Sequence, residues 1–371
     1  MTLITFGELF CGPGGIGLGA KQAKLITADD IYEIDHQWAI DSDIDSCRTF
    51  QHNISPDEPH KVICADIREF DITKLSPVNG FAFGFPCNDF SIVGEKKGLN
   101  GKYGSLFSYG VKIIQHLEPD WFLAENVSGL KSDNQGKTFS QMLEILSNAG
   151  SGYRLTTHLY RFEEYGVPQC RHRIVIVGFK KSLDKIFRVP MPTHNNSFMS
   201  VESALCNPPI PANAPNHEYT RQSPIVVERL KYIKQGENAW SANIPSHLQL
   251  NVKKARMSQI YRRLVPNKPA YTITGSGGGG THVYHWEEPR ALTNRERARL
   301  QTFPDDFIFF GSKESVRKQI GMAVPPKAVQ IIITAILKTL AGVSYPYVEP
   351  KWKDIFSEDG SFQLSLSLDN P

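Results

Sequence analysis

Short apolar runs alternate with stretches of helical periodicity over residues 1–180 of the chain. Continuous apolar strands separated by helices are typical of a parallel sheet that is covered on both faces. The pattern therefore predicts a doubly wound α/β fold with a mostly parallel sheet. The predicted strands are Leu3–Phe10, Trp38–Ser42, Lys61–Cys64, Gly80–Phe85, Trp121–Glu125, Tyr153–Tyr160 and Arg173–Phe179.

The pattern changes near Pro190, beyond which prolines and asparagines are frequent and neither period persists. Helical periodicity returns where Thr293 and Glu296 have the spacing of a capping box, and a further amphipathic helix is predicted over Lys327–Leu340. These changes predict four parts: a first domain (1–188), a smaller irregular domain (189–290), helices that return to the first domain (291–344) and a polar, peripheral C-terminal tail (345–371).

Charge is distributed unevenly along the 371 residues, although the net charge is only +3. Residues 1–150 hold 12 basic and 20 acidic side chains, whereas residues 151–320 hold 25 and 13. A basic segment favours a surface that binds a polyanion such as nucleic acid, because Lys and Arg neutralise phosphates. An ordinary solvated surface is the alternative.

Neither a membrane protein nor a metal protein is expected. The most apolar stretch, Ile331–Leu337, is far shorter than the roughly 20 residues that cross a bilayer. No basic segment precedes an apolar run at the N-terminus, so we expect a cytoplasmic protein without a signal peptide. The six cysteines include no C-x-x-C pair, which predicts reduced thiols rather than a metal site or a disulfide framework.

A glycine-rich turn follows the first predicted strand. Its sequence, from Gly12 through Gly14 to Gly17, has the G-x-G-x-x-G spacing that brings a nucleotide-like ligand to a helix N-terminus. Asp43 and Asp66 follow the next two strands and are candidates to accept hydrogen bonds from ribose hydroxyls and from an adenine amino group. The alternatives are a turn without a ligand and two helix-capping aspartates.

Candidate chemistry follows the fourth and fifth strands. Cys87 lies at the carboxyl end of the fourth strand, and a glycine-rich loop with Lys96 and Lys97 comes after it. Glu125 ends the fifth strand. A thiol and a carboxyl at one sheet edge suggest a nucleophile and an acid that act on one substrate, with a loop that closes over it. A buried apolar cysteine and a solvated loop are the alternatives.

Three polar residues alternate at the start of the last predicted strand. Alternation places Gln169, Arg171 and Arg173 on one side of an extended chain. Two guanidiniums beside a pocket suit carbonyl or phosphate oxygens. Surface ion pairs are the alternative interpretation of both arginines.

Taken in order, these motifs resemble those of the DNA (cytosine-5) methyltransferases. The resemblance extends from about Phe6 to Leu340 and implies an S-adenosylmethionine-dependent methyltransferase fold, with a target-recognition domain at 189–290. The motifs that carry it are Phe10-Cys11-Gly12-Pro13-Gly14-Gly15, Asp43-Ile44-Asp45, Asp66-Ile67, Pro86-Cys87, Ser105-Leu106-Phe107, Glu125-Asn126-Val127, Gln169-Cys170-Arg171-His172-Arg173, Arg295-Glu296-Arg297 and Gly321-Met322-Ala323-Val324-Pro325-Pro326.

The resemblance also implies residue roles. Cys87 would be the nucleophile that adds to cytosine C6, and Glu125 would contact N3 and the exocyclic amine. Arg173 would hold the O2 carbonyl, and Arg171 would help to order the site. The implied cofactor is S-adenosyl-L-methionine, bound by Phe10, Gly12, Gly14, Asp43, Ile44, Asp66, Ile67, Pro86 and Leu106.

Double-stranded DNA is the implied partner, with the target base extruded from the helix. We expect a monomer that is paired functionally with a separate restriction endonuclease and is associated with the nucleoid through DNA. The candidate DNA contacts are Ser91, Lys96, Lys97, Gln169, Lys253, Arg256, Arg262 and Arg263. Alternatives are a transfer-RNA cytosine-5 methyltransferase, a nicotinamide oxidoreductase that uses the glycine turn, and a DNA-binding module without activity.

Three positions depart from the family pattern. Met322 stands where Asn is usual, Asn88 replaces the commoner Gln after the nucleophile, and Asp43 is one methylene shorter than the frequent Glu. None of these changes affects the thiol, the N3 acid or the arginines. We therefore expect an active enzyme, with the polar contact at Met322 in doubt.

Overall fold

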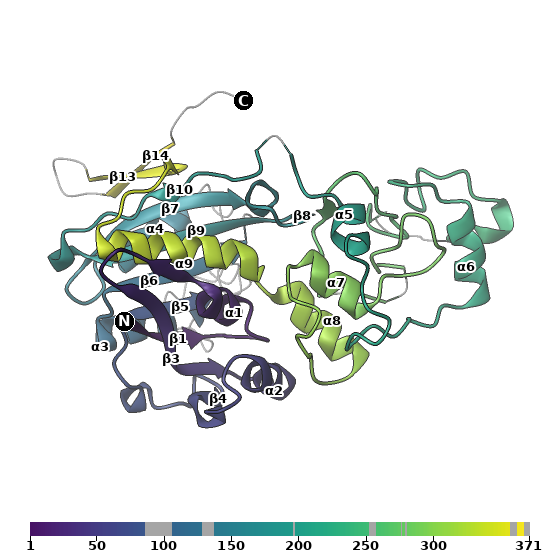
Figure 1. The fold of residues 1–371 in the computed structure, drawn as a ribbon. Coiled ribbons are helices and arrows are strands. Elements are labelled where there is room, and N and C mark those ends of the chain that lie inside the picture. Colours follow the sequence, from purple (N-terminus) through teal and green to yellow (C-terminus); the bar gives the residue numbers. More distant parts are fainter. Residues whose placement is uncertain are drawn as a thin grey trace. The chain divides into compact units, whose positions relative to one another are not determined.

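The computed structural model describes residues 1–85, 106–127, 137–195, 197–251, 257–275, 277–278, 280–356 and 362–366. The chain divides into two compact units (Figure 1). The first unit comprises Met1–Arg161, His172–Pro192 and Val329–Pro371, and the second comprises Phe162–Arg171 and Thr193–Ala328. Residues 291–328, which the sequence suggested would return to the first domain, fall in the second unit, and the chain returns only from Val329.

The first unit is built on a ten-stranded sheet of order β14-β13-β7-β9-β6-β5-β1-β3-β2, with β4 paired to β3. Strands β1, β3, β4, β5 and β6 are parallel, whereas β7, β9 and β13 run antiparallel to their neighbours. The sheet is therefore mixed. Its strands are β1 (Thr2–Leu9), β2 (Lys24–Ile26), β3 (Ile31–Asp41), β4 (Val62–Cys64), β5 (Gly80–Gly84), β6 (Trp121–Val127), β7 (Tyr153–Arg161), β9 (His172–Lys180), β13 (Trp352–Phe356) and β14 (Phe362–Leu366).

Alternate residues of the central strands face two apolar layers. On one face, Phe83 and its neighbours pack against the helices α3 (Leu106–Leu117) and α4 (Lys137–Ser147). On the other face, Phe6 stacks on Trp121 with ring centroids 5.6 Å apart. The helix α2 (Ile44–Asn53) covers this second face, because its Phe50 contacts His36 of β3, which contacts Phe6. The helix α1 (Gly15–Gln22) packs beside it, with Gly17 against Phe50. The sheet is thus buried on both sides, as its apolar strands predict.

The C-terminal tail is part of the sheet, which corrects the expectation of a peripheral segment. Trp352 of β13 pairs with Thr157 of β7, and its side chain is buried against Phe139 of α4. The helix α9 (Pro326–Ala341) precedes this tail and is joined to α1, because Gln330 donates to the carbonyl of Gln22. A short pair, β10 (Val189–Pro190) with β12 (Tyr347–Val348), also belongs to the first unit.

The second unit has little regular structure. The short strands β8 (Gln169–Cys170) and β11 (Ala270–Tyr271) form its parallel pair. Two apolar clusters form its core. The predicted capping box is confirmed: Thr293 caps α7 by accepting from the Glu296 amide, and Glu296 accepts from the Thr293 amide at 2.7 Å. Its helices are α5 (Val201–Cys206), α6 (Pro224–Lys231), α7 (Asn294–Leu300) and α8 (Lys313–Met322).

Buried arginines supply hydrogen bonds that the second unit lacks from sheet pairing. Arg263 donates to the carbonyls of four residues, Leu230, Ile233, His285 and Glu288. Arg295 donates to the carbonyls of three, Pro215, Pro304 and Phe307. Because a buried carbonyl without a donor is costly, these arginines hold irregular backbone in place.

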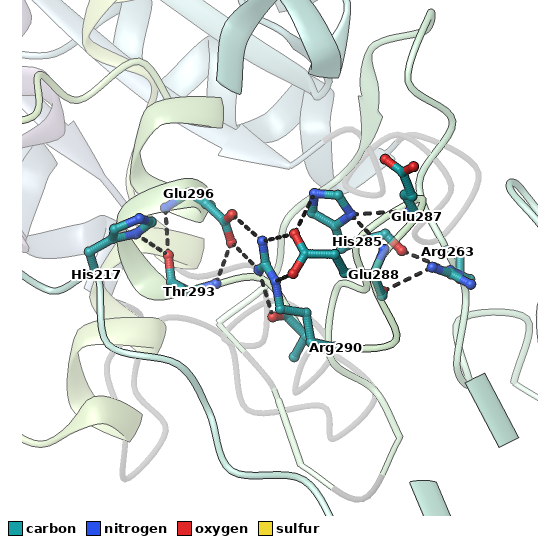
Figure 2. Close-up of polar contacts among 9 residues, drawn as sticks. His217, Arg263, His285, Glu287, Glu288, Arg290, Thr293 and Glu296 are labelled. Atoms are coloured by element: carbon teal, nitrogen blue, oxygen red, sulfur yellow. Dashed lines mark hydrogen bonds and ion pairs between the residues drawn. The ribbon is translucent and has the colours of Figure 1, made fainter. Parts of the chain in front are cut away.

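A polar network surrounds the start of α7 (Figure 2). Arg290 forms ion pairs with Glu288 and with the capping residue Glu296, at 2.9 and 2.8 Å. The Nδ1 atom of His285 accepts from the backbone amides of Glu287 and Glu288. Burial, followed by the charge of Arg290, lowers the pKa of His285. The network therefore links the segment before α7 to the helix itself.

One segment, Lys313–Ala341, is long and apolar enough to cross a membrane. Of its most apolar window, 72% is buried inside the protein. The segment comprises α8 and α9, whose apolar side chains Ile320, Ile333 and Ile336 are almost fully buried. Its apolar character is thus accounted for by core packing.

Candidate active site

Five parallel strands of the first unit end at the same edge of the sheet. The glycine turn follows β1, the segment with Asp43 follows β3, and Asp66 follows β4. Phe85 follows β5, and Glu125 lies near the end of β6. Because the carboxyl ends of parallel strands are where open α/β sheets bind ligands, this edge is the candidate site.

Glu125 and Arg173 form an ion pair at this edge. The Nε atom of Arg173 lies 2.8 Å from Oε1 of Glu125, and each side chain is only 12% exposed. Strand β9 runs antiparallel to β6, so its first residues pair with the last residues of β6, with Val127 opposite Arg173. The antiparallel strand, which the sequence did not predict as such, is thus what brings the guanidinium to the carboxylate.

The second oxygen of Glu125 is oriented toward β5. Gly84 pairs with Glu125 in the sheet, and a Cβ atom on Gly84 would lie 3.3 Å from Oε2. A larger residue at Gly84 would therefore press on the carboxylate. Among the described residues Glu125 has no side-chain partner besides Arg173. Oε1 is engaged by the guanidinium, while Oε2 points to the strand that leads into Pro86 and Cys87.

Asn126 ties the ends of β5 and β6 together. Its side chain is buried, its Nδ2 atom donates to the Phe85 carbonyl at 2.9 Å, and its Oδ1 atom accepts from the Val127 amide. Sequence reasoning gave this residue no role. The available signal was a polar residue within an apolar strand, because such a residue needs buried partners.

Several predicted residues lie outside the described part of the chain. They are Pro86 and Cys87 at the end of β5, the loop residues Ser91, Lys96 and Lys97, and the basic residues Lys253 and Arg256. Their roles stay predictions.

The glycine turn after β1 has the backbone that its sequence predicts. Phe10, Gly12 and Gly14 have φ angles of 57°, 53° and 96°, in the left-handed region. Asp41, at the end of β3, holds the turn: its Oδ2 atom accepts from the Gly12 amide at 2.8 Å, and its Oδ1 atom accepts from the Asp43 amide. A Cβ atom on Gly12 would meet nothing within 4 Å, so the turn borders open space.

Asp43 caps α2, the alternative that the sequence left open. Its Oδ1 atom accepts from the Ser46 amide at 2.9 Å. The next residue, Ile44, is the first residue of α2 and is 53% exposed. An exposed apolar face beside a carboxylate suits a ligand that has both an aromatic ring and hydroxyl groups.

Asp66 lies at the end of β4. Its carboxylate accepts from Nε of Arg68 at 2.9 and 3.0 Å, and this contact lowers the pKa of Asp66. Ile67 is 3% exposed and belongs to the core, and Leu106, at the start of α3, packs against the same core. The side chain of Asp66 is thus partly accessible, whereas that of Ile67 lies in the interior.

A buried carboxyl group lies beneath the glycine turn. Glu8 of β1 is 1% exposed, and burial, followed by the charge of Asp41, raises its pKa. Its Oε2 atom has no hydrogen-bond partner among the described residues. Cys11 is also buried, which raises the pKa of its thiol. Burial thus disfavours the charged form of this carboxyl, which sequence reasoning missed.

Gln169 and Arg171 belong to the interior of the second unit, whereas Arg173 belongs to the first. Gln169 is fully buried: its Oε1 atom accepts from the Ile273 amide at 2.8 Å, and its Nε2 atom donates to Gln301. Arg171 is 2% exposed and donates to the Ile273 carbonyl. Gln169 and Arg171 thus both contact Ile273, as the alternation predicts, whereas Arg173, beyond the interruption at Arg171 between β8 and β9, pairs with Glu125 instead.

The two predicted DNA contacts Arg262 and Arg263 differ in position. Arg263 is buried, and its guanidinium is occupied by four backbone carbonyls. That position argues against a phosphate contact, and we correct the expectation on this ground. Arg262 is partly exposed, with its guanidinium 4.7 Å from the centroid of the Tyr271 ring. Of the two, Arg262 is the one whose side chain is accessible, and its role in DNA binding stays a prediction.

Met322 ends α8 in the second unit and is 65% exposed. The preceding residue, Gly321, packs against backbone: a Cβ atom there would lie 2.0 Å from the Gly275 amide nitrogen. Only glycine permits this close approach.

None of the groups of His, Cys, Asp and Glu within the described ranges has an arrangement that could hold a metal ion.

Comparison with known proteins places the motifs in a family. A model of the C-5 cytosine-specific DNA methylases matches residues 4–338. The chain is 59% identical to the Type II methyltransferase M.BbvI of Brevibacillus brevis, over 93% of this chain and 94% of that protein. It is 39% identical to the Type II methyltransferase M.NgoFVII of Neisseria gonorrhoeae, over 89% of this chain and 85% of that protein.

Solved structures share the fold at low sequence identity. A DNA modification methyltransferase encoded within an E. coli prophage matches 91% of this chain and 99% of its own, with a TM-score of 0.69 and 22% identity. The Dnmt2 methyltransferase of S. pombe matches 91% of this chain and 99% of its own, with a TM-score of 0.57 and 17% identity. The α/β methyltransferase fold predicted from the sequence is confirmed.

Proposed function

The chain belongs to the C-5 cytosine-specific DNA methylase family and is a cytosine-5 DNA methyltransferase of the restriction-modification type, and from that premise we propose how its residues perform the reaction. The observation that carries the proposal is the Glu125–Arg173 ion pair, at the sheet edge where β5 leads into Cys87. It joins an acid on β6 and a cation on β9, and β6 pairs with β5, the strand that precedes the predicted nucleophile in the sequence.

We propose that the glycine-turn edge holds S-adenosyl-L-methionine. The fit rests on the open space at Gly12, the left-handed turn that Asp41 holds, and the exposed apolar side chain of Ile44. Backbone amides of the turn suit the methionine carboxylate, Asp43 the ribose and Asp66 the adenine amino group. When bound, the cofactor supplies an electrophilic methyl group.

Cys87 activates the base in this mechanism. Cytosine C5 is a poor nucleophile until the Cys87 thiolate adds to C6 and N3 takes up a proton, which turns the ring into an enamine. C5 would then form a bond to the methyl group as the bond between that group and the cofactor's sulfur breaks, with the electron pair remaining on sulfur. Loss of the C5 proton and cleavage of the bond between Cys87 and C6 restore the aromatic ring and the free thiolate.

Glu125 is the proposed acid at N3, and Arg173 is the group that orients it. With Oε1 held by the guanidinium, Oε2 is directed to the edge where the base enters. A carboxyl group that serves N3 delivers a proton as Cys87 adds and recovers it as the thiolate leaves. Arg173 also carries positive charge that stabilises the electron-rich ring and binds the O2 carbonyl.

The base reaches these groups only outside the duplex, because C6 is covered inside a stacked helix. We propose that the target cytosine is flipped into the site, at a cost on the order of a few kcal/mol. Double-stranded DNA is then the partner, and a separate endonuclease reads the same sequence. The protein acts as a monomer in the bacterial cytoplasm.

Labelled S-adenosylmethionine tests this proposal. The wild-type protein is expected to label duplex DNA but not transfer RNA, and Cys87→Ser to label neither. Label found in transfer RNA alone would overturn the choice of substrate. Undiminished labelling of duplex DNA by the Cys87→Ser variant would overturn the covalent mechanism.

A further inference from the structure

Arg297, in the middle of α7, is buried without the partners that such a side chain needs. It is 1% exposed, and its Nη2 atom lies 3.3 Å from Nδ1 of His282. Its Nε and Nη1 atoms have no hydrogen-bond partner among the described residues. On the same helix, by contrast, Arg295 spends Nε, Nη1 and Nη2 on three backbone carbonyls.

The helix α8, which packs against α7, carries a second buried arginine. Arg317 of α8 is 7% exposed and donates to the Gly277 carbonyl. Among the described residues no carboxylate forms an ion pair with Arg297 or Arg317. Burial, followed by the charge of Arg317, lowers the pKa of Arg297 to about 10, and burial also lowers the pKa of Arg317. Because a guanidinium keeps its proton in proteins, both side chains carry positive charge.

Uncompensated positive charge in a protein interior is expensive, which is why such groups normally have an ion or a hydrogen-bonded partner. His282 does not add to this charge. Burial, together with the two arginines, lowers its pKa to about 4, so the ring is neutral. The group of Arg297, Arg317 and His282 therefore offers two cations, and the Nε and Nη1 atoms of Arg297 are buried N–H donors without an acceptor among the described residues.

We propose that Arg297 and Arg317 form a subsite for one backbone phosphate of the DNA substrate. This inference rests on the proposed function, because it takes DNA as the substrate. A guanidinium presents parallel N–H donors that match phosphate oxygens, and two of them bind a phosphate more tightly than one. The subsite supplies affinity and register on the duplex rather than base readout.

The phosphate approaches from the side of Gly277 and Gly278. Arg317 contacts the first of these residues. The second is exposed, and a Cβ atom there would meet nothing within 4 Å. Small residues at this position let a phosphate come close to the guanidiniums, and the phosphate then replaces the Gly277 carbonyl as the acceptor of Arg317.

The salt dependence of DNA binding tests the subsite. The probe is a duplex with the sequence that methylation-sensitive sequencing identifies as modified, and fluorescence anisotropy gives Kd over a range of KCl concentrations. Arg297→Gln and Arg317→Gln are each expected to weaken binding about tenfold at 0.15 M salt. Each is also expected to reduce the slope of log Kd against log salt concentration by about 0.9, which corresponds to one lost phosphate contact.

Arg295→Gln is the matched control. Its three carbonyl bonds hold backbone, so it is expected to lower the unfolding temperature and leave the salt slope at the wild-type value. A wild-type slope for folded Arg297→Gln would overturn the proposal. Absence of duplex binding by the wild-type protein would instead overturn the proposed function, so the two failures are distinguishable.

A second measurement does not depend on the stability of the variants. Neutral methylphosphonates replace the phosphates of the duplex one at a time. At one position the wild-type protein is expected to lose about tenfold in affinity, and Arg297→Gln to lose nothing further. Equal losses for both proteins at every position would overturn the proposal. It would also be overturned if inorganic phosphate stabilised the wild-type protein while the affinity for DNA did not depend on Arg297.

Discussion

The two compact units satisfy their backbone hydrogen bonds by different means. In the first, ten strands pair with one another around layers of apolar side chains such as Phe83 and Trp121. In the second, the β8–β11 pair is two residues long, and buried arginines donate to carbonyls of irregular segments. In the second unit, buried arginine side chains therefore donate the hydrogen bonds to backbone carbonyls that a neighbouring strand donates in the first unit.

This difference changes the meaning of the basic middle segment. Its excess of Lys and Arg suggested a surface for nucleic acid, yet Arg171, Arg263 and Arg295 lie inside the second unit and bind backbone. Charge counted along a sequence thus overstates the charge that a partner meets. Arg173 of the first unit is different again, because it pairs with a carboxylate at the sheet edge.

Glu125→Gln is expected to have the largest effect, on activity rather than on stability. Loss of the acid at N3 removes about 10²- to 10⁴-fold from kcat, the range of general acid catalysis. The comparison is sharpened by Glu296→Gln, which alters the carboxylate of the α7 capping box. Single-turnover methyl transfer and thermal unfolding are measured for both. A large loss of kcat in folded Glu296→Gln would contradict the assignment of catalysis to Glu125 and of helix capping alone to Glu296.

Arg263→Leu is expected to destabilise the second unit by about 3–5 kcal/mol, because four carbonyls lose their donor inside the protein. Urea unfolding measures the change. The neighbouring variant Arg262→Leu, which loses a contact with the Tyr271 ring, is expected to cost only about 0.5–1 kcal/mol. Equal costs for the two variants would contradict the view that carbonyl bonding by arginine holds this unit together.

Patterns of apolar residues predicted the strands of the first unit well, because a buried strand needs a continuous apolar run. They did not give strand direction: β9 runs antiparallel to both β6 and β7, and that reversal brings Arg173 to Glu125. The tail was missed for a different reason. The apolar–polar alternation of Phe362–Leu366 is only five residues long and lies in a polar segment, so the composition of the segment outweighed it.

The candidate site was predictable where motifs fix the backbone and not where burial decides. Gly12 and Gly14 have the left-handed angles that their spacing implies. Asp41 and Asn126, which hold the turn and the strand ends, have no sequence signal beyond a polar residue near an apolar strand. Gln169 was predicted to contact DNA because it is polar. Its side chain is instead buried, with three hydrogen bonds to other residues of the second unit.

Acid is expected to weaken both units through buried histidines. Burial, followed by Arg297 and Arg317, lowers the pKa of His282 to about 4, and burial followed by Lys351 does the same for His158 of the first unit. Between about pH 6.5 and 4 the unfolded chain binds protons that the folded chain does not. The contribution of these histidines to the free energy of unfolding is therefore fully present above about pH 6.5. It decreases as the pH is lowered from there to about 4, by up to about 1.4 kcal/mol per pH unit for each histidine.

Unfolding of His282→Gln and His158→Gln between pH 7 and 5 checks this sign. Each variant is expected to flatten the pH dependence of its own unit. Stability that rises on acidification in the wild-type protein, or a slope unchanged by both substitutions, would contradict the assignment.

Thr293→Ala is expected to have the smallest effect, about 1 kcal/mol, because it removes one of the two reciprocal bonds of the capping box. Thr293→Ser keeps the hydroxyl and is expected to remain near the wild-type stability. Thermal unfolding of the pair measures the difference. A loss as large as that of Arg263→Leu would mean that α7, rather than the arginine contacts, limits the stability of the second unit.

The central claim, that Cys87 bonds to C6 of an extruded cytosine, is tested most directly by a mechanism-based trap. A duplex with 5-fluorocytosine at the modified position is incubated with the protein and S-adenosylmethionine, since fluorine at C5 prevents the final elimination. The account predicts one duplex attached per protein, with the adduct mapped by mass spectrometry to the peptide that contains Cys87. Methyl transfer to ordinary DNA without any adduct on the fluorinated duplex, or an adduct at another cysteine such as Cys170, would contradict it.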